Sequence, residues 1–491
     1  MAKAMFITRG GEHFPPMGIM QISATAKLGG HETCLGLLSK GDIWERIEKE
    51  KPDAIAYTGS TGEHKFYFNF NHELKKRNPE IKTIMGGPHA TFFPEKTLEE
   101  GGMDAVCIGE GDYAFPEFLD RLDNKKDFSG LENIMMNGDL TKPRLRPLVQ
   151  NLDSLPFSDR TIFYDNGQSG ENPLKHFFVS RGCPYNCTYC FNEQFKNMYS
   201  GQRYVRTRSV DSVIEEIKEV REKWPLKYIK FYDDIFHVKV DDWFREFAEK
   251  YKKEIGLPFF ALTRTNLVDG EMVDLFSKAG CKAISMSIES ANPRIREEVL
   301  NRKMTNEQIK RAYKLFGEKR IAIQSNNILG LPTSTIKDDV DTLDFNIECG
   351  PKQKAIVMAE FTTAHPYPGT ELYEFCKRNG YYSSETGFSE MHMSYQYESP
   401  LNCFTPMEKR MQRNLTMLGP VAVTLPWMRD LIVNHLIKRP TNSAYFTAFS
   451  LNKSLRYMRH IYPLNRGLNE YLKVVYNSFR KNWFKRMDEK S

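Results

Sequence analysis

Hydrophobic and polar positions alternate in a regular rhythm along the first 125 residues of the chain. Short apolar runs lie at residues 3–8, 32–36, 53–58, 82–85 and 104–108. The stretches between them have the apolar spacing that is typical of amphipathic helices. Five such units predict an α/β domain over residues 1–126 with a doubly wound parallel sheet, Rossmann-like or flavodoxin-like. Ligands of such sheets bind outside the carboxyl ends of the strands.

A second array of the same kind follows. Apolar runs at residues 177–181, 228–232, 259–264, 283–289, 321–329 and 355–361 each precede a helical pattern. Six such units are too few to close an eight-stranded barrel, which takes about 250 residues. We therefore predict a partial (βα)6 TIM barrel over residues 173–383, whose active-site groups lie at the carboxyl ends of its strands.

The rhythm breaks in two places. Residues 127–172 are rich in Pro, Asp and Asn and predict a linker between the two arrays. Beyond residue 384 the apolar runs no longer alternate with helical patterns, and residues 384–491 predict a mainly helical domain that caps the barrel or contacts the substrate.

Composition narrows the class of protein. Of the 491 residues, 40% are apolar and 27% are charged, as in soluble proteins, and no apolar run is long enough to span a bilayer. Six of the nine cysteines are scattered, which favours a reducing cytoplasm over a disulfide framework. The charge is uneven, because residues 404–491 carry 16 Lys and Arg but 5 Asp and Glu.

Glycines gather at the predicted carboxyl edge of the first sheet, where they let the backbone approach a ligand closely. A single loop of this kind is explained as well by a tight turn between strand and helix. Several on one edge favour a ligand site. The candidate residues are Pro15, Pro16, Thr58, Gly59, Ser60, Thr61, Gly86, Gly87, Pro88, His89, Gly109, Glu110 and Gly111.

Three cysteines, Cys183, Cys187 and Cys190, form a CxxxCxxC run directly after the apolar run at 177–181. A four-iron cluster takes thiolate ligands, and three of them leave one iron without a protein ligand. Zinc is the main alternative because CxxC pairs also serve structural zinc sites. A zinc site usually takes a fourth ligand at short spacing, and the next cysteine is Cys281. The run therefore favours a 4Fe-4S cluster.

A CxxxCxxC run after the first strand of a partial barrel resembles the radical S-adenosylmethionine (SAM) enzymes, and the resemblance extends through the whole barrel. It implies that Cys183, Cys187 and Cys190 hold the cluster that cleaves SAM to a 5′-deoxyadenosyl radical. It also implies an electron donor such as flavodoxin or ferredoxin. Tyr189, beside the third cysteine, is then expected next to the adenine, although packing against its own loop is the alternative.

Polar residues also end other strands of the barrel. Carboxylates there suit the SAM ammonium or ribose, and a guanidinium suits its carboxylate. Two further segments resemble the ribose-binding pair and the adenine motif of the family. The expected residues are Asp233 and Asp234 for the ammonium or ribose, Arg264 for the carboxylate, Glu289 and Ser290 as the ribose pair, and Asn327 and Gly330 in the adenine motif. Any one of them could instead be a solvated strand end.

The segments 206–209 and 365–371 resemble a narrower group, the radical SAM enzymes with an N-terminal cobalamin-binding domain. That group carries a Pro-Pro loop, Gly-Gly-Pro-His and Gly-Glu-Gly-Glu in its first domain, and the same runs occur here with Asp112 for the last Glu. The resemblance implies cobalamin at residues 1–126. No Asp-x-His-x-x-Gly run is present, so we expect no protein imidazole on cobalt and interpret His89 as a loop or corrin-edge residue.

Most members of this group resemble methyltransferases, so the resemblance implies methyl transfer to an unactivated carbon or phosphorus of a small molecule. The alternative is a cyclase, a ring-rearranging or an oxygen-inserting enzyme. A tRNA-modifying radical SAM enzyme is a second alternative, but its usual additional cysteine set is missing, so nucleic acid is an unexpected partner. A cobalamin-binding sensor without catalysis would have no use for three clustered thiolates.

The C-terminal region joins apolar residues to positive charge, in the run from Pro420 to Trp427 and at Lys438 and Arg439. Aromatic and basic residues alternate again between 471 and 486. Helices of this composition can lie on an anionic membrane surface. A lipid-like substrate and peripheral contact with the inner face of the membrane are therefore hypotheses. The alternative is a helical cap with an ordinary solvated basic face.

Overall fold

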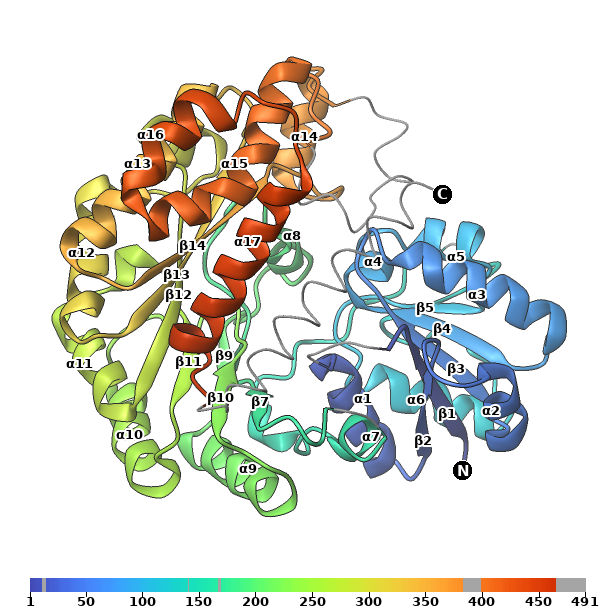
Figure 1. Cartoon of the computed structure of the whole chain (residues 1–491). Coiled ribbons are helices and arrows are strands. Elements are labelled where there is room, and N and C mark those ends of the chain that lie inside the picture. Colours follow the sequence, from blue (N-terminus) through green and yellow to red (C-terminus); the bar gives the residue numbers. More distant parts are fainter. Residues whose placement is uncertain (11–14, 140, 167–168, 383–398, 465–491) are drawn as a thin grey trace.

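The computed structural model of the chain contains two six-stranded, mainly parallel sheets, each with its own helices, and a C-terminal group of helices on the second (Figure 1). It describes residues 1–10, 15–139, 141–166, 169–382 and 399–464. The expected α/β class with a helical C-terminal region is confirmed for these residues.

The first sheet has the strand order β2-β1-β3-β4-β5-β6. Its strands are β1 (Lys3–Thr8), β2 (Glu32–Leu37), β3 (Ala54–Thr58), β4 (Lys82–Gly86), β5 (Ala105–Cys107) and β6 (Ile134–Met136). Its helices are α1 (Met17–Leu28), α2 (Ile43–Glu50), α3 (His64–Arg77), α4 (Gly87–Phe92), α5 (Pro94–Gly101) and α6 (Ala114–Asp123). The first five strands are parallel and the strand order reverses at β1, which is the expected doubly wound arrangement.

The predicted linker is packed into the structure rather than free. Its strand β6 pairs antiparallel with β5 and so extends the first sheet. Farther along come the short helices η1 (Leu152–Ser154) and α7 (Thr161–Tyr164), and the latter joins the core of the first domain. Arg160 is buried and donates to Glu216 at 2.9 Å, which ties this segment to the second array.

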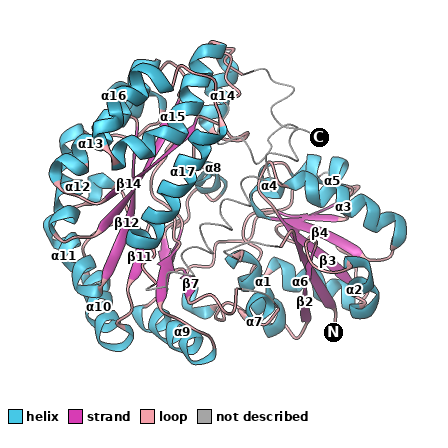
Figure 2. Ribbon diagram, in the orientation of Figure 1, coloured by secondary structure: helices cyan, strands magenta, loops and turns pink. Residues whose placement is uncertain are grey.

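The second sheet is entirely parallel, in the order β14-β13-β12-β11-β10-β7, and it does not close. Its strands are β7 (Leu174–Phe177), β10 (Tyr228–Phe231), β11 (Phe259–Leu262), β12 (Cys281–Glu289), β13 (Ala322–Leu329) and β14 (Val357–Thr363). The α-helices are α8 (Phe191–Met198), α9 (Val210–Lys223), α10 (Asp242–Lys250), α11 (Gly270–Ala279), α12 (Asn306–Glu318), α13 (Ile336–Cys349) and α14 (Glu371–Arg378). Helices α9 to α13 cover its outer face (Figure 2), as in a partial barrel.

The strand expected at 177–181 is divided. Its first part belongs to β7, whereas β8 (Ser180–Arg181) pairs antiparallel with β9 (Arg206–Thr207) in a separate ribbon. The carboxylate of Asp233 accepts the backbone N–H groups of Val179 and Ser180 at 2.9 and 2.7 Å. The ladder therefore ends here because a side chain takes the place of the neighbouring strand.

The C-terminal region is helical, as predicted, over the residues that the structure describes. It comprises α15 (Pro406–Thr424), η6 (Pro426–Met428), α16 (Arg429–Leu431), η7 (Ile432–Leu436), α17 (Ser443–Arg456) and η8 (Tyr457–Ile461). Helix α15 contacts β14 and α13, and η8 contacts β12 and β13. The aromatic and basic run at 471–486 lies outside the described residues.

Gly87 begins α4 with φ +88°, and a Cβ atom there would lie 2.6 Å from Thr58 Oγ1. We expect Gly87→Ala to lower the free energy of unfolding by about 2 to 4 kcal/mol, through left-handed strain and the clash. Gly41→Ala is the matched control, with φ +63° and open space around it, and should cost about 1 kcal/mol. Urea denaturation measures both, and equal losses would contradict the close approach of Gly87 to Thr58 at the end of β3.

Candidate functional site

A cavity of about 810 Å³ lies between the carboxyl ends of the two sheets. Both domains supply its walls. From the first domain come Thr58, Gly86, Gly87, Pro88, Gly109, Glu110 and Gly111, and from the second come Arg181, Gly182, Tyr189, Cys190, Tyr232 and Asp234. Part of each predicted set of residues therefore lines the same cavity.

The three predicted cluster ligands lie on one loop between β8 and α8. Cys187 is buried, and Cys183 and Cys190 are half-buried. Burial raises the pKa of the Cys183 thiol to about 11, and burial also raises the pKa of Cys190. Cationic iron would offset this cost, because it binds and stabilises the thiolate form.

Two guanidinium groups face the buried thiol. Arg264 and Arg302 place nitrogens 3.2 and 3.9 Å from Cys187 Sγ. A cysteine sulfur with two guanidinium groups beside it is suited to bind a cluster as a thiolate. Across the described residues, no three His, Cys, Asp or Glu side chains converge on a point where one metal ion would bind. Thiolates of a four-iron cluster each bind a different iron, so they need no such convergence.

Tyr189 and Glu289 are brought together as predicted neighbours of one ligand. The Tyr189 hydroxyl donates to Glu289 Oε1 at 2.6 Å and accepts from Arg302 at 2.8 Å. Glu289 ends β12 with φ +63°, an unusual conformation for a residue with a side chain, and such strain gathers at functional sites. Arg302 escaped the sequence prediction because it follows a helical turn instead of a strand end.

The neighbours Asp233 and Asp234 have different surroundings. Asp233 is buried and its Oδ1 accepts hydrogen bonds from the backbone of residues 179 and 180 and from Ser180 Oγ. Burial raises the pKa of its carboxyl to about 7. It thus supports the turn that leads to the cysteines. Asp234 is exposed and lines the cavity, so it is the member of the pair that can reach a ligand.

Arg264 also lies near the cluster loop, stacked 3.8 Å over the ring of Tyr185. Three other predicted SAM residues have partners within the protein. The Ser290 carbonyl accepts from Arg296 at 2.6 Å, the Asn327 side chain donates to the Glu360 carbonyl at 3.1 Å, and the Gly330 N–H donates to Asp339 at 2.9 Å. Contact of these three residues with SAM stays a prediction.

The glycine edge of the first domain forms a concave wall above apolar side chains. Phe6, Ile22, Ile84 and Phe115 lie beneath it in the same cavity. A Cβ atom at Gly86 would meet only Cys107, at 3.8 Å, so this stretch of wall is open to a ligand. Open backbone over an apolar floor fits a large, flat ring such as a corrin.

The remaining residues of the predicted cobalamin set lie away from the cavity lining. Gly59, Ser60, Thr61, Pro15 and Pro16 are among them, and so is His89. His89 is buried, stacks on His64 with ring centroids 3.8 Å apart and pairs with Thr61 at 3.1 Å. Burial lowers its pKa to about 3, so its imidazole is neutral.

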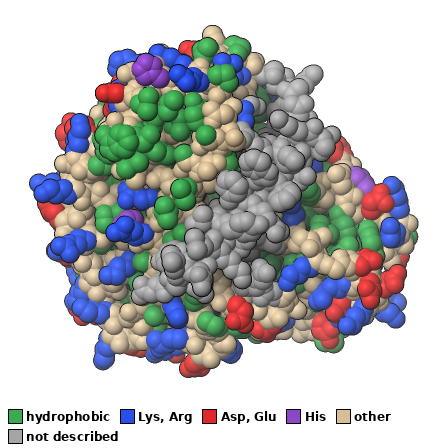
Figure 3. Space-filling view, in the orientation of Figure 1, with side chains coloured by type: hydrophobic (Ala, Val, Ile, Leu, Met, Phe, Trp, Pro, Cys, Tyr) green, Lys and Arg blue, Asp and Glu red, His purple; other side chains and the backbone are tan. Residues whose placement is uncertain are grey.

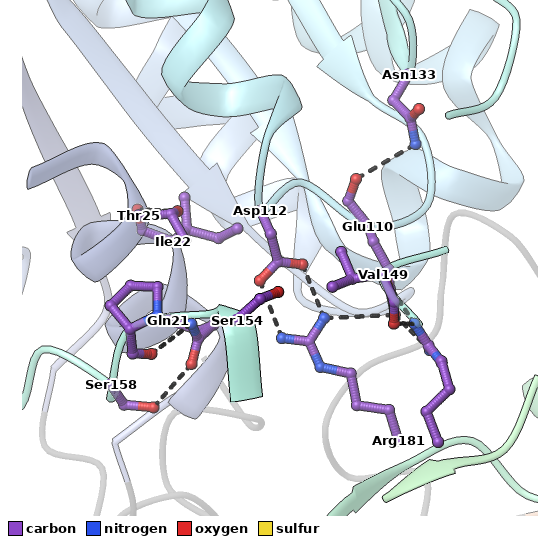
Figure 4. Close-up of polar contacts among 12 residues, drawn as sticks. Gln21, Ile22, Thr25, Glu110, Asp112, Asn133, Val149, Ser154, Ser158 and Arg181 are labelled. Carbon is purple, nitrogen blue, oxygen red and sulfur yellow. Dashed lines mark hydrogen bonds and ion pairs between the residues drawn. The ribbon is translucent and has the colours of Figure 1, made fainter. Parts of the chain in front are cut away.

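Charged pairs that the sequence does not predict join the two walls. Arg181 donates to both carboxylate oxygens of Asp112 (Figure 4). Arg206 donates to both oxygens of Glu110. Glu110, predicted to contact cobalamin, therefore uses its carboxylate on the second domain. Gln21 donates to the Pro156 carbonyl at 3.1 Å and holds the rim of the same cavity.

Comparison with known proteins matches the same two units. The family model described as the radical SAM superfamily covers residues 177–345, and the one described as the B12 binding domain covers residues 2–119. An uncharacterized methyltransferase of Pyrococcus horikoshii is 30% identical over 74% of this chain and 79% of its own length. The chain belongs to the cobalamin-dependent radical SAM enzymes. Its cofactors are a 4Fe-4S cluster, SAM and cobalamin.

Other relatives of this radical SAM enzyme differ in their named reactions. The cytidylyl-2-hydroxyethylphosphonate methyltransferase of Streptomyces wedmorensis is 24% identical over 72% of each chain. The anaerobic magnesium-protoporphyrin IX monomethyl ester cyclase of Rubrivivax gelatinosus is 24% identical over 74% of this chain and 66% of its own. The methyltransferase TsrM of Kitasatospora setae, solved with cobalamin and a [4Fe-4S] cluster, shares the fold with TM-score 0.66 and 13% identity, over 98% of this chain and 99% of its own.

Cys187→Ala should abolish the visible absorption of the reconstituted cluster and the reductive cleavage of SAM, because an iron loses its thiolate. Cobalamin binding should persist, since the glycine edge contains none of the three cysteines. Cys281→Ala is the control, a buried thiol at the start of β12, and should leave the cluster spectrum unchanged. Absorption and desalting experiments measure both cofactors, and an unchanged cluster in Cys187→Ala would refute the ligand assignment.

Proposed function

We propose that this enzyme transfers a methyl group from SAM, by way of cobalamin, to an unactivated carbon or phosphorus of a small-molecule substrate. One observation carries the proposal. A single cavity is lined by the cysteine loop on one side and by the glycine edge of the cobalamin-binding domain on the other. This arrangement would let both cofactors act on one substrate.

Different residues would hold the cluster and SAM. Cys183, Cys187 and Cys190 would hold the cluster, and Asp234 and Arg264 would bind the ammonium and carboxylate of SAM. When bound, the cluster and SAM supply a carbon radical and cobalamin supplies the methyl group. A small donor protein such as flavodoxin or ferredoxin would deliver the electron.

Tyr189, Glu289 and Arg302 would orient the nucleoside. Their hydrogen bonds to one another fix the three side chains before any ligand arrives, and such preorganisation lowers the cost of orienting a ligand. Arg302 is buried and paired with Glu289 at 3.5 Å, so it orients that carboxylate to accept from ribose hydroxyls.

Incubation of the reconstituted enzyme with deuterated-methyl SAM and an extract of the native host tests the reaction. We expect a new species that carries the methyl label, together with 5′-deoxyadenosine, by mass spectrometry. Cys187→Ala is the matched control and should produce neither. Formation of 5′-deoxyadenosine without label in any product would contradict methyl transfer and favour ring formation or rearrangement.

We further propose that the enzyme rests on an anionic membrane surface, where a lipid-like substrate would be found. The apolar run of α15 is mostly core, since Val421 and Val423 are buried, but Leu425, Trp427 and Leu431 are exposed by 38, 76 and 47%. Figure 3 shows an apolar patch on the surface over α16, with Lys and Arg side chains near it. The exposed Lys438 and Arg439 follow η7 in the chain, and their positive charges complement anionic headgroups.

This contact would be peripheral. No helix among the residues that the structure describes is long and apolar enough to cross a bilayer. Inserted aromatic and leucine side chains each contribute about 2 kcal/mol, and basic residues near the surface add about 1 kcal/mol each.

The double variant Trp427→Ala, Leu431→Ala should bind phosphatidylglycerol-containing vesicles at least about tenfold more weakly than the wild-type chain. Leu451→Ala, Leu455→Ala is the matched control, since both leucines are about equally exposed, at 46 and 51%, on α17. Co-sedimentation measures the affinity. Equal binding by the wild type and the Trp427 variant, or binding by neither, would refute the contact.

A further inference from the structure

The loop that carries the cysteines begins and ends at two arginines that lie opposite each other. Strands β8 and β9 pair antiparallel, and Arg181 is the partner of Arg206 in their register. Residues 182–205 therefore form a closed excursion that contains all three cysteines and α8. Whatever holds the two arginines holds both ends of this loop at once.

Both arginines bind the same acidic turn of the first domain. Arg206 donates to the two oxygens of Glu110 at 2.9 and 2.7 Å. Arg181 donates to the two oxygens of Asp112 at 2.8 and 2.9 Å and lies 3.4 Å from Glu110 (Figure 4). Paired N–H···O bonds from a planar guanidinium fix orientation as well as distance. We call these four residues the acid–arginine clamp.

The clamp is largely withdrawn from water. The side chains of Arg206 and Asp112 are 1 and 4% exposed, and those of Glu110 and Arg181 are 15 and 28% exposed. Pairs of this kind contribute little net stability, but a buried charge that loses its partner costs several kcal/mol. The clamp therefore opposes any change in the angle or distance between its two walls more than it stabilises the fold.

Two further contacts come from within the loop. The Tyr199 hydroxyl lies 3.4 Å from the Glu110 N–H and from Asn133 Nδ2, and a Cβ atom at Gly109 would come within 2.0 Å of it. Phe191, directly after Cys190, stacks on Phe92 of α4 with ring centroids 5.0 Å apart. The part of the loop from Phe191 to Tyr199 thus contacts the cobalamin-binding domain, while Tyr185 and Cys187 contact the barrel.

We propose that Arg181, Arg206, Glu110 and Asp112 are positioning residues that set the separation and orientation of the cluster and the cobalamin. The inference deepens the proposed function, since that reaction needs both cofactors in one cavity. Misplacement of reacting groups by about 1 Å can cost about a hundredfold in rate. The clamp gives the cysteine loop one fixed place relative to the glycine edge, and the Glu110 carboxylate serves the arginines instead of the corrin.

Asp112→Asn tests the clamp, because it keeps the size of the side chain and removes the charge that pairs with Arg181. The reduced cluster and cob(II)alamin are both paramagnetic, so pulsed electron paramagnetic resonance of the holoenzyme reports their dipolar interaction. We expect a broader distance distribution in the variant at full occupancy of both cofactors. Amide hydrogen exchange over residues 182–205 should rise about tenfold.

Asp344→Asn is the matched control. It removes a carboxylate that binds Arg429 through both oxygens, at 2.7 and 2.6 Å, between α13 and α16. Both readouts should keep their wild-type values in this control. A second variant, Arg181→Lys, keeps the charge and loses the fork, and should broaden the distances less than Asp112→Asn.

Wild-type dipolar distances and exchange rates in Asp112→Asn would overturn the proposal. If that variant does not fold, the outcome for Arg181→Lys decides in the same way. Neither readout requires substrate or methylated product. A failure of the methyl-transfer experiment would therefore leave this test intact, and a failure of this test would leave methyl transfer open.

Discussion

The carboxyl ends of the strands in the two large sheets face each other, and buried pairs of arginine and carboxylate hold the sheets in this arrangement. Every other feature of the site depends on this constraint. A parallel sheet offers its ligand at one edge only, so two cofactors held by two sheets can share a substrate only when those edges meet. The cysteine loop lies at the meeting point because it follows the first strand of the second sheet.

The interface uses charged pairs in addition to apolar contacts such as Phe92 on Phe191. Apolar packing tolerates small sliding, because its energy depends on buried area more than on direction. Guanidinium and carboxylate groups tolerate much less, since a displaced pair leaves buried charges without partners. Arg160, buried against Glu216, is a directional charged pair of the same kind, and it ties the segment that joins the domains to the second domain. The structure therefore places directional contacts where relative position matters.

The sequence predicted the elements well because their signals are local. The apolar run at 3–8 and the glycine pair at 86 and 87 act through neighbours a few residues away. The partners of Asp112, by contrast, lie 69 residues later in the chain, and no local pattern identifies them. The Pro-, Asp- and Asn-rich composition of residues 127–172 predicts a linker, and the strand within it, β6, is only three residues long and pairs antiparallel with β5, so it gives no comparable local signal. Arg302 was missed for a similar reason, since its contacts with Tyr189 and Glu289 bridge distant parts of the chain.

In two of the predicted motifs, consecutive residues at a strand end make different contacts. Side chains of consecutive residues in extended backbone point in opposite directions. Asp233 consequently turns inward to hold residues 179 and 180, while Asp234 turns to the cavity. At the end of β12 the backbone is not extended, since Glu289 has a positive φ; there the Glu289 side chain bonds Tyr189, and the backbone carbonyl of Ser290 binds the buried Arg296. In each pair, one residue faces the predicted ligand, and the other holds the strand end in a fixed conformation.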